Sequence, residues 1–571
     1  MTLLQPAHAF LAPDNTLGFG IGDVIELALA SLLAALLLFR AKCEQLVRQL
    51  AAREGLSMAL LALLPVLLRL ALLGHNPVPT PRIYDEFSHL LVADTLRHFR
   101  LANPPHPLHR FFETFFVIQE PSYSSIYPIG QGLILAIGWT LFGHPWAGVV
   151  LSVACFCALT YWMLRGWVSP GWALIGGLLA VLEFGPLNEW MNSYWGGMVT
   201  ACAGCLVFGA LPRLREHGRP RDAVLLGAGV ALSLLTRPYE TLFLLLSIAA
   251  YFCGVTYTSK ANLPSRTTLI KLVGVSLLAF LPGVVFTLAQ NQAVTGSWTT
   301  LPYQLSQFQY GVPTSLTIQP NPIPHLPLTR EQQLDYIAQR SFHGEDRDTL
   351  TKFLRRLEYR IRFYRFFFLP PLYIAFLIFV ATIREFRFAW ILFTFLLFAL
   401  GTNLFPYFYP RYVAVETPLF VLASVLGLRH LSGVTIRGCA AGREAAAVLV
   451  FFCVALFAFW YGLSFFTDTD QAPDARSQVI QQLEKFPGKQ VVFVRYSPHH
   501  VFQNEWVYNA ADIDSARIVW ARDLGPKENE RLCDYYHGRR FWLLEPDADP
   551  PLLTPYQSAT SRNPGPFLAV P

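Results

Sequence analysis

Residues 56–74 read LSMALLALLPVLLRLALLG, and the tetrapeptide Tyr84-Asp85-Glu86-Phe87 follows about ten residues later. A helix needs about 20 apolar residues to cross the hydrocarbon core of a bilayer, or about 17 at the short end. The first segment therefore predicts a membrane-spanning helix with an acidic pair beyond its end. Such a pair is either an ordinary solvated loop or part of a functional site, depending on where the rest of the chain places it.

The composition is that of a membrane protein. Of 571 residues, 53% are hydrophobic and 14% are charged, and apolar runs recur along most of the length. We predict a multi-pass α-helical membrane protein with about twelve transmembrane helices. The predicted spans are 21–39, 56–74, 147–164, 172–187, 197–211, 223–236, 240–257, 270–290, 363–382, 388–404, 413–429 and 446–464.

Charge and cysteine usage exclude some function classes. The net charge of +6 does not indicate a nucleic-acid partner, because the basic residues lie in short loops between apolar runs. Cys202 and Cys205 have CxxC spacing, but they lie in an apolar run without a second pair or a nearby histidine. Packing is therefore favoured over metal or redox chemistry for these thiols.

Lys and Arg in short loops predict the orientation, because such loops carry more positive charge on the cytoplasmic side. Arg48 and Arg53 follow the first span, and no basic residue precedes it. This places the N-terminus outside and Asp85-Glu86 on the external face. The run 126–142 is short and contains three glycines, and counting it as a span would reverse the sides of the later basic loops. We therefore expect it to lie along the external membrane surface.

Three larger pieces remain outside in this topology. They are an external loop at 75–146, a second at 291–362 that ends in a basic helix, and the tail from 465. The tail contains strand-like runs around QVVFVRY, ARIVWARDL and RFWLLEP, and a helix-like run PKENERLCDYYHG, which predict a small α/β domain. The predicted division is therefore an extra N-terminal helix and basic loop at 1–55, a membrane domain at 56–464, and an external domain at 465–571.

This pattern resembles the GT-C glycosyltransferases. The acidic pair in the first external loop, the juxtamembrane helix that opens with Tyr127-Pro128, and the paired helices with short basic turns carry the resemblance over about residues 56–430. The chain looks most like the protein O-mannosyltransferase and aminoarabinose-transferase branch, including bacterial family 39 and Rgt-like members. The tail does not resemble the MIR module of the eukaryotic mannosyltransferases, so a protein acceptor does not carry over.

The resemblance implies inverting transfer of a sugar from a polyprenyl-phosphate carrier to an external acceptor. Asp85 matches the family's catalytic aspartate, and Glu86 matches its neighbour, which orients the base or contacts the acceptor. A positioned carboxylate suits this role because it takes the proton of an attacking hydroxyl, a weak nucleophile. The leaving phosphate needs stabilising positive charge rather than a strong acid.

Two arginines at predicted external helix ends are candidates for that charge. Arg237 lies in TRPYE and Arg411 lies in FPYFYPRY. An Arg fork matches phosphate oxygens, and a charge near membrane depth is costly enough to suggest a function. Both arginines could instead be interfacial anchors whose charged ends reach to water. The same alternative applies to Arg69, inside the first core helix.

The segment 188–195 is also external in this topology. Glu189 is the nearest match to an acidic residue that family members carry here, and Asn192 and Tyr194 are candidates for binding sugar hydroxyls, with Tyr127 as a further substrate-binding candidate. The tryptophans beside them also fit an ordinary interfacial belt. His89 and His98 are expected on a loop or helix surface. His499 and His500 have no spacing typical of a metal site.

No cofactor is expected to be required. Some GT-C branches use a divalent ion, but here the carboxylates would be Asp85, Glu86 and Glu189 without a DxD motif, and hard cations want many oxygen ligands. The expected partners are a polyprenyl-phosphate-linked sugar, a lipid, glycan or protein acceptor, and the bilayer. The expected location is the bacterial cytoplasmic (inner) membrane, with the site and the tail on the periplasmic side.

A transporter or lipid flippase has the same composition and is the main alternative. Transporters are expected to show ionisable residues at mid-membrane, broken helices and repeated halves. In this chain the polar segments lie on one face, and no matching halves are evident. Chemistry at the external surface is therefore favoured over alternating access. A non-catalytic scaffold whose tail binds partners is a third interpretation.

Overall fold

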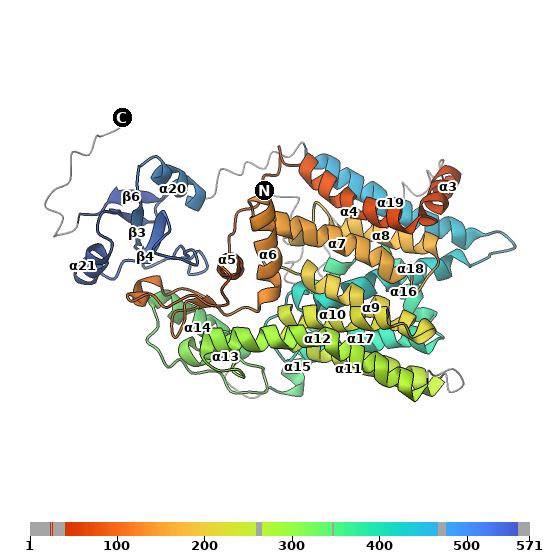
Figure 1. Cartoon of the computed structure of the whole chain (residues 1–571). Coiled ribbons are helices and arrows are strands. Elements are labelled where there is room, and N and C mark those ends of the chain that lie inside the picture. Colours follow the sequence, from red (N-terminus) through yellow and green to blue (C-terminus); the bar gives the residue numbers. More distant parts are fainter. Residues whose placement is uncertain are drawn as a thin grey trace.

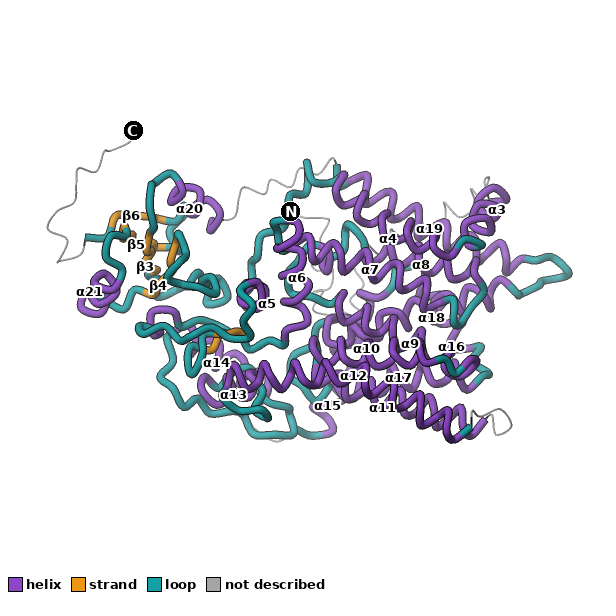
Figure 2. Tube along the Cα trace, viewed as in Figure 1, coloured by secondary structure: helices purple, strands orange, loops and turns teal. Residues whose placement is uncertain are grey.

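In the computed structural model, long helices lie side by side in a bundle, and a small β-sheet lies beyond one end of it (Figure 1, Figure 2). The structure describes residues 40–258, 265–344, 348–465 and 475–557, together with Asp23 and Glu26. The predicted span 21–39 therefore falls almost entirely outside the described residues.

Each predicted span from residue 56 onward coincides with helical structure. The bundle consists of α3 (Arg40–Ala51), α4 (Glu54–Ala71), α7 (Trp146–Leu164), α8 (Pro170–Phe184), α9 (Met198–His217), α10 (Pro220–Thr236), α11 (Pro238–Thr258), α12 (Arg266–Thr295), α16 (Leu372–Ala381), α17 (Phe386–Thr402), α18 (Thr417–Ser432) and α19 (Ala441–Leu463).

By length and composition, six of the described helices can cross a membrane, or up to seven if one bent pair counts as a single span. Shorter apolar helices, such as α8 and α17, account for other predicted spans. The chain is thus a multi-pass helical membrane protein, and the total of about twelve spans stays a prediction.

One predicted span is wrong in shape. Residues 363–382 do not form one straight helix. The chain bends by 116° between the helical segment Leu350–Phe367 and helix α16. The break contains Pro370 and Pro371. Proline lacks a backbone N–H and disfavours the helical conformation in the residue before it, so two consecutive prolines end the first segment. That segment comprises α15 (Leu350–Arg360) and the 3₁₀ helix η4 (Ile361–Phe367).

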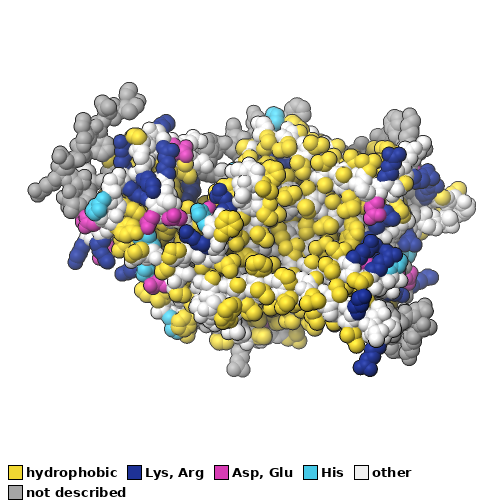
Figure 3. All heavy atoms as spheres, in the orientation of Figure 1, with side chains coloured by type: hydrophobic (Ala, Val, Ile, Leu, Met, Phe, Trp, Pro, Cys, Tyr) yellow, Lys and Arg dark blue, Asp and Glu magenta, His cyan; other side chains and the backbone are white. Residues whose placement is uncertain are grey.

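Apolar side chains cover the middle of the bundle, and a dense group of Lys and Arg marks the end that lies away from the sheet (Figure 3). The opposite end, called here the loop-rich end, carries the remaining helices and short strands of the connections. These are α5 (Tyr84–Arg97), η2 (His109–Phe112), β1 (Val117–Ile118), β2 (Ser124–Ser125), α6 (Ile129–Phe142), η3 (Glu189–Met191), α13 (Pro302–Tyr310), α14 (Arg330–His343) and η5 (Pro410–Glu416).

Helix α6 is the run 126–142 that was expected to lie along the membrane surface, and it stands across the direction of the neighbouring bundle helices (Figure 1). Its glycines allow this crossing. A Cβ atom on Gly138 would lie 2.0 Å from the backbone nitrogen of Gly148 in α7, and one on Gly132 would lie 2.3 Å from Val92 in α5. Because α6 packs this closely, the residues before it are brought against α5.

The tail forms a four-stranded sheet with two helices. The strand order is β4-β3-β5-β6, in which β3 is parallel to β4 and β5, and β6 is antiparallel to β5. The three predicted strand runs and the predicted helix are all present. The division at residues 55/56 and 464/465 stays a prediction. The elements are α20 (Ala475–Glu484), β3 (Gln490–Val494), β4 (Ile518–Arg522), α21 (Pro526–Tyr535), β5 (Arg540–Glu545) and β6 (Leu552–Pro555).

Candidate active site

The acidic pair opens helix α5. Asp85 and Glu86 lie in its first turn, where carboxylates interact favourably with the positive end of the helix dipole. Both side chains are buried, with 6% of each residue exposed. The pair is therefore not a solvated loop, because buried carboxylates require specific partners.

Asp85 accepts a hydrogen bond from the hydroxyl of Tyr127, which directly precedes α6. Tyr127 in turn stacks on His89, with ring centroids 4.2 Å apart. His89 is 5% exposed, so the expectation that it lies on a surface is wrong. The reason is the crossing of α6, which covers this face of α5.

Burial raises the pKa of Asp85 to about 6, while the hydrogen bond from Tyr127 and the charges of Arg411 and Arg237 lower it. The carboxylate is thus mostly ionised at neutral pH and still basic enough to take up a proton. The charges of both arginines also act on His89, whose pKa is lowered first by its burial and then by these charges. Two arginines and one carboxylate from three distant segments therefore share one site.

Arg411 lies in η5, and its side chain is only 1% exposed. Its Nη2 pairs with Glu189, and its guanidinium lies 3.4 Å from the ring centre of Trp195. Within the described part of the chain, its Nε and Nη1 have no hydrogen-bond partner. A buried guanidinium that keeps two unused donors is suited to an anionic ligand.

Arg237 follows α10 and lies 4.9 Å from the ring centre of Tyr412. Its charge acts on Asp85, on Tyr127 and on the partly buried Tyr303. Arg411 and Tyr412 are neighbours in the FPYFYPRY segment. The same loop therefore positions Arg411 and, through the ring of Tyr412, contacts Arg237.

Glu86 has a different environment. Its Oε2 accepts from the backbone N–H groups of Arg82 (2.8 Å) and Ile83 (3.3 Å), and its Oε1 accepts from the Ser193 hydroxyl and the Tyr194 N–H, both at 2.9 Å. The first two bonds close the start of α5, and the other two tie it to the 188–195 segment. All four donors come from the protein, and whether Glu86 orients the base or contacts the acceptor stays a prediction.

The contacts of Asn192 and Tyr194 do not favour the sugar-binding roles predicted for them. Asn192 accepts from Arg69 Nε at 2.8 Å and donates to the carbonyls of Pro186 and Asn188. The Tyr194 hydroxyl donates to the Pro79 carbonyl at 2.7 Å. Arg69 also donates to two loop carbonyls, so it anchors the loop after α4 rather than reaching to water.

Asp335 in α14 is a site residue that sequence reasoning missed. It is 2% exposed and accepts hydrogen bonds from Gln339. The charge of Asp85 acts on it, and its own charge acts on Tyr84, the neighbour of Asp85. The pKa of Asp335 is raised to about 7. Burial is the largest cause, the hydrogen bonds from Gln339 oppose it, and the charge of Asp85 adds to it. The polar sequence of 291–362 contained no signal that distinguished this carboxylate.

Arg360 was also missed as a positioning residue, because it lies in a basic run that resembles a solvated helix. Arg360 is 2% exposed and donates to the carbonyls of Thr402, Pro406 and Tyr407 at 2.8, 2.9 and 3.3 Å. It thereby caps the end of α17 and holds the loop that leads to Arg411. Lys352 and Arg355 in the same run are exposed, as expected of an amphipathic helix.

The carboxylates of the site do not form a metal cluster. Asp85 is bonded to Tyr127, all four hydrogen bonds of Glu86 go to protein donors, and Glu189 is paired with Arg411. Among the described residues, no three His, Cys, Asp or Glu side chains are arranged to hold a metal ion. The residues therefore do not fit a divalent ion, and metal independence stays a prediction.

The tail packs against the same helix. Phe87, beside Glu86, stacks on Tyr508 of the tail with ring centroids 4.5 Å apart, and the Ala511 N–H donates to Asp94 at 2.8 Å. Arg522 of β4 forms ion pairs with Glu331 of α14 and with Glu505. The two loops and the tail are therefore joined around the start of α5.

Comparisons with known proteins give structural neighbours only. No protein-family model matches the chain, and no curated protein sequence matches it either. Among solved structures, ArnT from Cupriavidus metallidurans bound to undecaprenyl phosphate aligns with 85% of this chain and 92% of its own, at 12% identity and a TM-score of 0.50.

Two further neighbours score lower. The apo state of ArnT from Cupriavidus metallidurans covers the same shares at 12% identity, with a TM-score of 0.48. The apo Archaeoglobus fulgidus oligosaccharyltransferase aligns with 86% of this chain and 69% of its own at 12% identity, with a TM-score of 0.40. The match to the ligand-bound ArnT structure shows that this chain shares the overall fold of that structure.

Proposed function

We propose that this protein is an integral-membrane glycosyltransferase that moves a sugar from a polyprenyl-phosphate donor to an acceptor hydroxyl. The observation that carries the proposal is the convergence of Asp85, Tyr127, Arg237 and Arg411 at the loop-rich end of a GT-C fold. The related ArnT structure binds undecaprenyl phosphate, which supports a lipid phosphate as the donor's carrier.

In the proposed reaction, the acceptor oxygen attacks the anomeric carbon of the donor from the face opposite the phosphate. The new C–O bond forms as the bond from carbon to phosphate oxygen breaks, and the bonding electrons leave with the lipid phosphate. Asp85 takes the hydroxyl proton. Attack from the opposite face gives a product with inverted anomeric configuration.

The unused donors of Arg411 and the nearby charge of Arg237 are proposed to hold the phosphate. They stabilise the charge that the phosphate gains as its bond to the sugar breaks, which lowers the barrier without a general acid. Glu189 keeps Arg411 oriented, and Glu86 and Tyr127 keep Asp85 in place.

We further propose that the loop-rich end faces the outside of a bacterial cytoplasmic membrane. The dense group of Lys and Arg at the opposite end of the bundle supports this orientation (Figure 3). Reporter fusions at residues 47 and 217 are expected to be cytoplasmic, and a fusion in the tail at Gly488 is expected to be external. A cytoplasmic tail would contradict the orientation.

The decisive experiment is a donor screen. Purified protein in lipid is incubated with synthetic polyprenyl-phosphate sugars, and release of the lipid phosphate is measured. Turnover of at least one donor that is lost in Asp85→Asn, while the variant keeps its unfolding midpoint, supports the proposal. Directional movement of a lipid or solute across vesicles without any bond cleavage would instead favour a transporter.

A further inference from the structure

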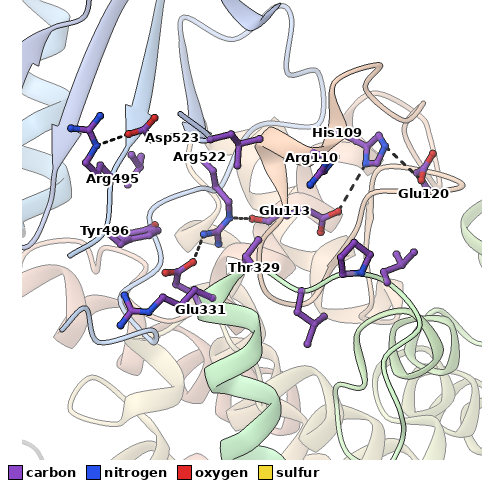
Figure 4. Close-up of a pocket in the computed structure, with 16 residues that line it drawn as sticks. His109, Arg110, Glu113, Glu120, Thr329, Glu331, Arg495, Tyr496, Arg522 and Asp523 are labelled. Atoms are coloured by element: carbon purple, nitrogen blue, oxygen red, sulfur yellow. Dashed lines mark hydrogen bonds and ion pairs between the residues drawn. The ribbon is translucent and has the colours of Figure 1, made fainter. Parts of the chain in front are cut away.

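A cavity of about 430 Å³ lies where the tail meets both long loops, and we call it the junction cavity (Figure 4). This volume is within the range of small-ligand sites, about 300–1,000 Å³. Its walls come from four segments of the sequence. They are 109–120 of the first loop, 326–331 at the start of α14, and the residues after β3 and β4.

The tail's contribution has the geometry of a ligand site. Strands β3 and β4 are parallel, and the cavity is bordered by the residues at and after their carboxyl ends, from Val494 and from Arg522 onward. In open parallel sheets, ligands bind outside the carboxyl ends of the strands, because the connections there leave a crevice. In this protein the two loops close that crevice.

Arg522 joins the walls of the junction cavity. It donates to the Glu113 carbonyl and to Glu331, each at 2.6 Å (Figure 4). It also pairs with Glu505. Its contacts thus fix one loop residue, one α14 residue and one tail residue relative to each other. The cavity is therefore held in shape by buried ion pairs rather than by loose loop contacts.

The charges that line the cavity balance. Four arginines, at positions 110, 330, 495 and 522, stand against four carboxylates, at positions 113, 120, 331 and 523. A strongly anionic or cationic ligand gains nothing from such a wall. A neutral ligand with many hydroxyl groups finds both donors and acceptors within reach. Leu326, Pro327 and Leu328 add an apolar wall, which suits the C–H faces of sugar rings.

Helix α14 connects this cavity to the candidate active site. Glu331 lines the cavity, and Asp335, on which the charge of Asp85 acts, follows about one turn later, a rise of about 6 Å. The same face of α14 contacts the first loop through Gln332, which donates to Glu113 and to the Thr114 carbonyl. Helix α14 therefore runs from the cavity to a residue that feels the charge of Asp85.

We propose that the junction cavity binds the acceptor of the transfer reaction and that this acceptor is a saccharide chain. The proposal rests on the function proposed above and adds the class of its second substrate. A lipid acceptor would approach through the apolar belt, whereas this cavity is built from the two polar loops and the tail. The alternative is a peptide acceptor, and the test below distinguishes the two.

Binding is tested on the full-length protein in lipid nanodiscs without a donor, so that it does not depend on catalysis. The probes are neutral di- to tetrasaccharides of hexoses and N-acetylhexosamines, and a soluble Ser/Thr-rich peptide. Saturation-transfer NMR reports their contact with the protein. At least one saccharide is expected to bind, and Leu326→Trp, which fills the cavity, is expected to weaken it at least tenfold.

The matched control is Ile323→Trp, an exposed residue of the same segment outside the cavity, which is expected to bind as the wild type does. No saccharide binding, equal binding by the two variants, or binding of the peptide alone would overturn the proposal. If saccharide binding depends on Leu326 but no lipid-phosphate sugar is turned over, the proposed reaction fails and the binding site stands. If donors are turned over but saccharides do not bind, only the acceptor assignment fails.

Discussion

Tyr127 donates its hydroxyl hydrogen bond to the carboxylate of Asp85, 42 residues earlier in the chain. Asp85 opens α5 and Tyr127 directly precedes α6, so this bond exists because the glycines of α6 let it cross against α5. The bond holds the carboxylate in place and favours its charged form. It therefore links the packing of two helices to the basicity of the proposed catalytic group.

Asp85→Asn is expected to lower the rate of sugar transfer by about 10²–10⁴-fold, because an amide cannot take the acceptor's proton. Release of lipid phosphate from the donor measures the loss. Asp534→Asn, an exposed position on α21, is the control and is expected to retain full activity. Equal rates in the Asp85 variant and the wild type would remove Asp85 from its proposed role.

The activity is expected to depend on pH through Asp85. Its pKa is raised to about 6, so the ionised base forms as the pH rises through 6, and the rate falls below it. Tyr127→Phe removes a hydrogen bond that lowers this pKa, so the acidic limb is expected to move to higher pH by about one unit. The profile of kcat/KM against pH measures the shift.

Tyr194→Phe is the control for that experiment, because its hydroxyl bonds to the Pro79 carbonyl and not to Asp85. This variant is expected to keep the position of the acidic limb. A limb that stays in place in Tyr127→Phe would mean that another group controls the pH dependence.

Arg411→Lys is expected to raise the KM for the donor by about tenfold or more. Lysine keeps the charge but loses the planar fork that matches two phosphate oxygens. Initial rates against donor concentration measure the change. Arg429→Lys, at an exposed position in the last turn of α18, is expected to leave the donor KM unchanged. An unchanged KM in Arg411→Lys would argue against phosphate binding by this residue.

Glu86→Gln is expected to destabilise the protein by about 2 kcal/mol or more. Glu86 now accepts hydrogen bonds through both of its oxygens, for example from the N–H groups of Arg82 and Tyr194. The NH₂ group of glutamine would replace one of these oxygens and leave its buried donors without an acceptor. The unfolding midpoint in detergent measures this loss. A lost activity with an unchanged midpoint would instead assign Glu86 to the chemistry.

Arg522→Met is expected to destabilise the docking of the tail by about 3 kcal/mol, because it leaves the nearly buried carboxylates of Glu331 and Glu505 without their partner. Limited proteolysis between the bundle and the tail measures the undocking. Arg531→Met, which removes an exposed pair with Glu528, is expected to cost less than about 1 kcal/mol. Equal protease resistance in both variants would contradict the structural role of Arg522.

Hydropathy and loop charge were sufficient to predict a multi-pass helical protein and the α/β elements of the tail, because these features depend on the local chain and its solvent. They also identified Arg237 and Arg411 as candidates, since charges beside membrane helices are rare and costly. Asp85 was identified as a candidate by its match to the catalytic aspartate of the GT-C glycosyltransferases. That residues 126–142 lie along the membrane surface stays a prediction. The bend after η4 was missed because apolar composition outweighed the signal of Pro370 and Pro371.

Only the tertiary structure revealed the burial of His89, the approach of Asp335 to Asp85 and the capping role of Arg360. These contacts join segments that are tens to hundreds of residues apart in the chain, and sequence periodicity carries no information about which distant segments meet. The same reason explains why Asn192 and Tyr194, which look like sugar-binding residues in sequence, are engaged by protein partners. A polar side chain shows its chemistry in the sequence, but its partners depend on packing.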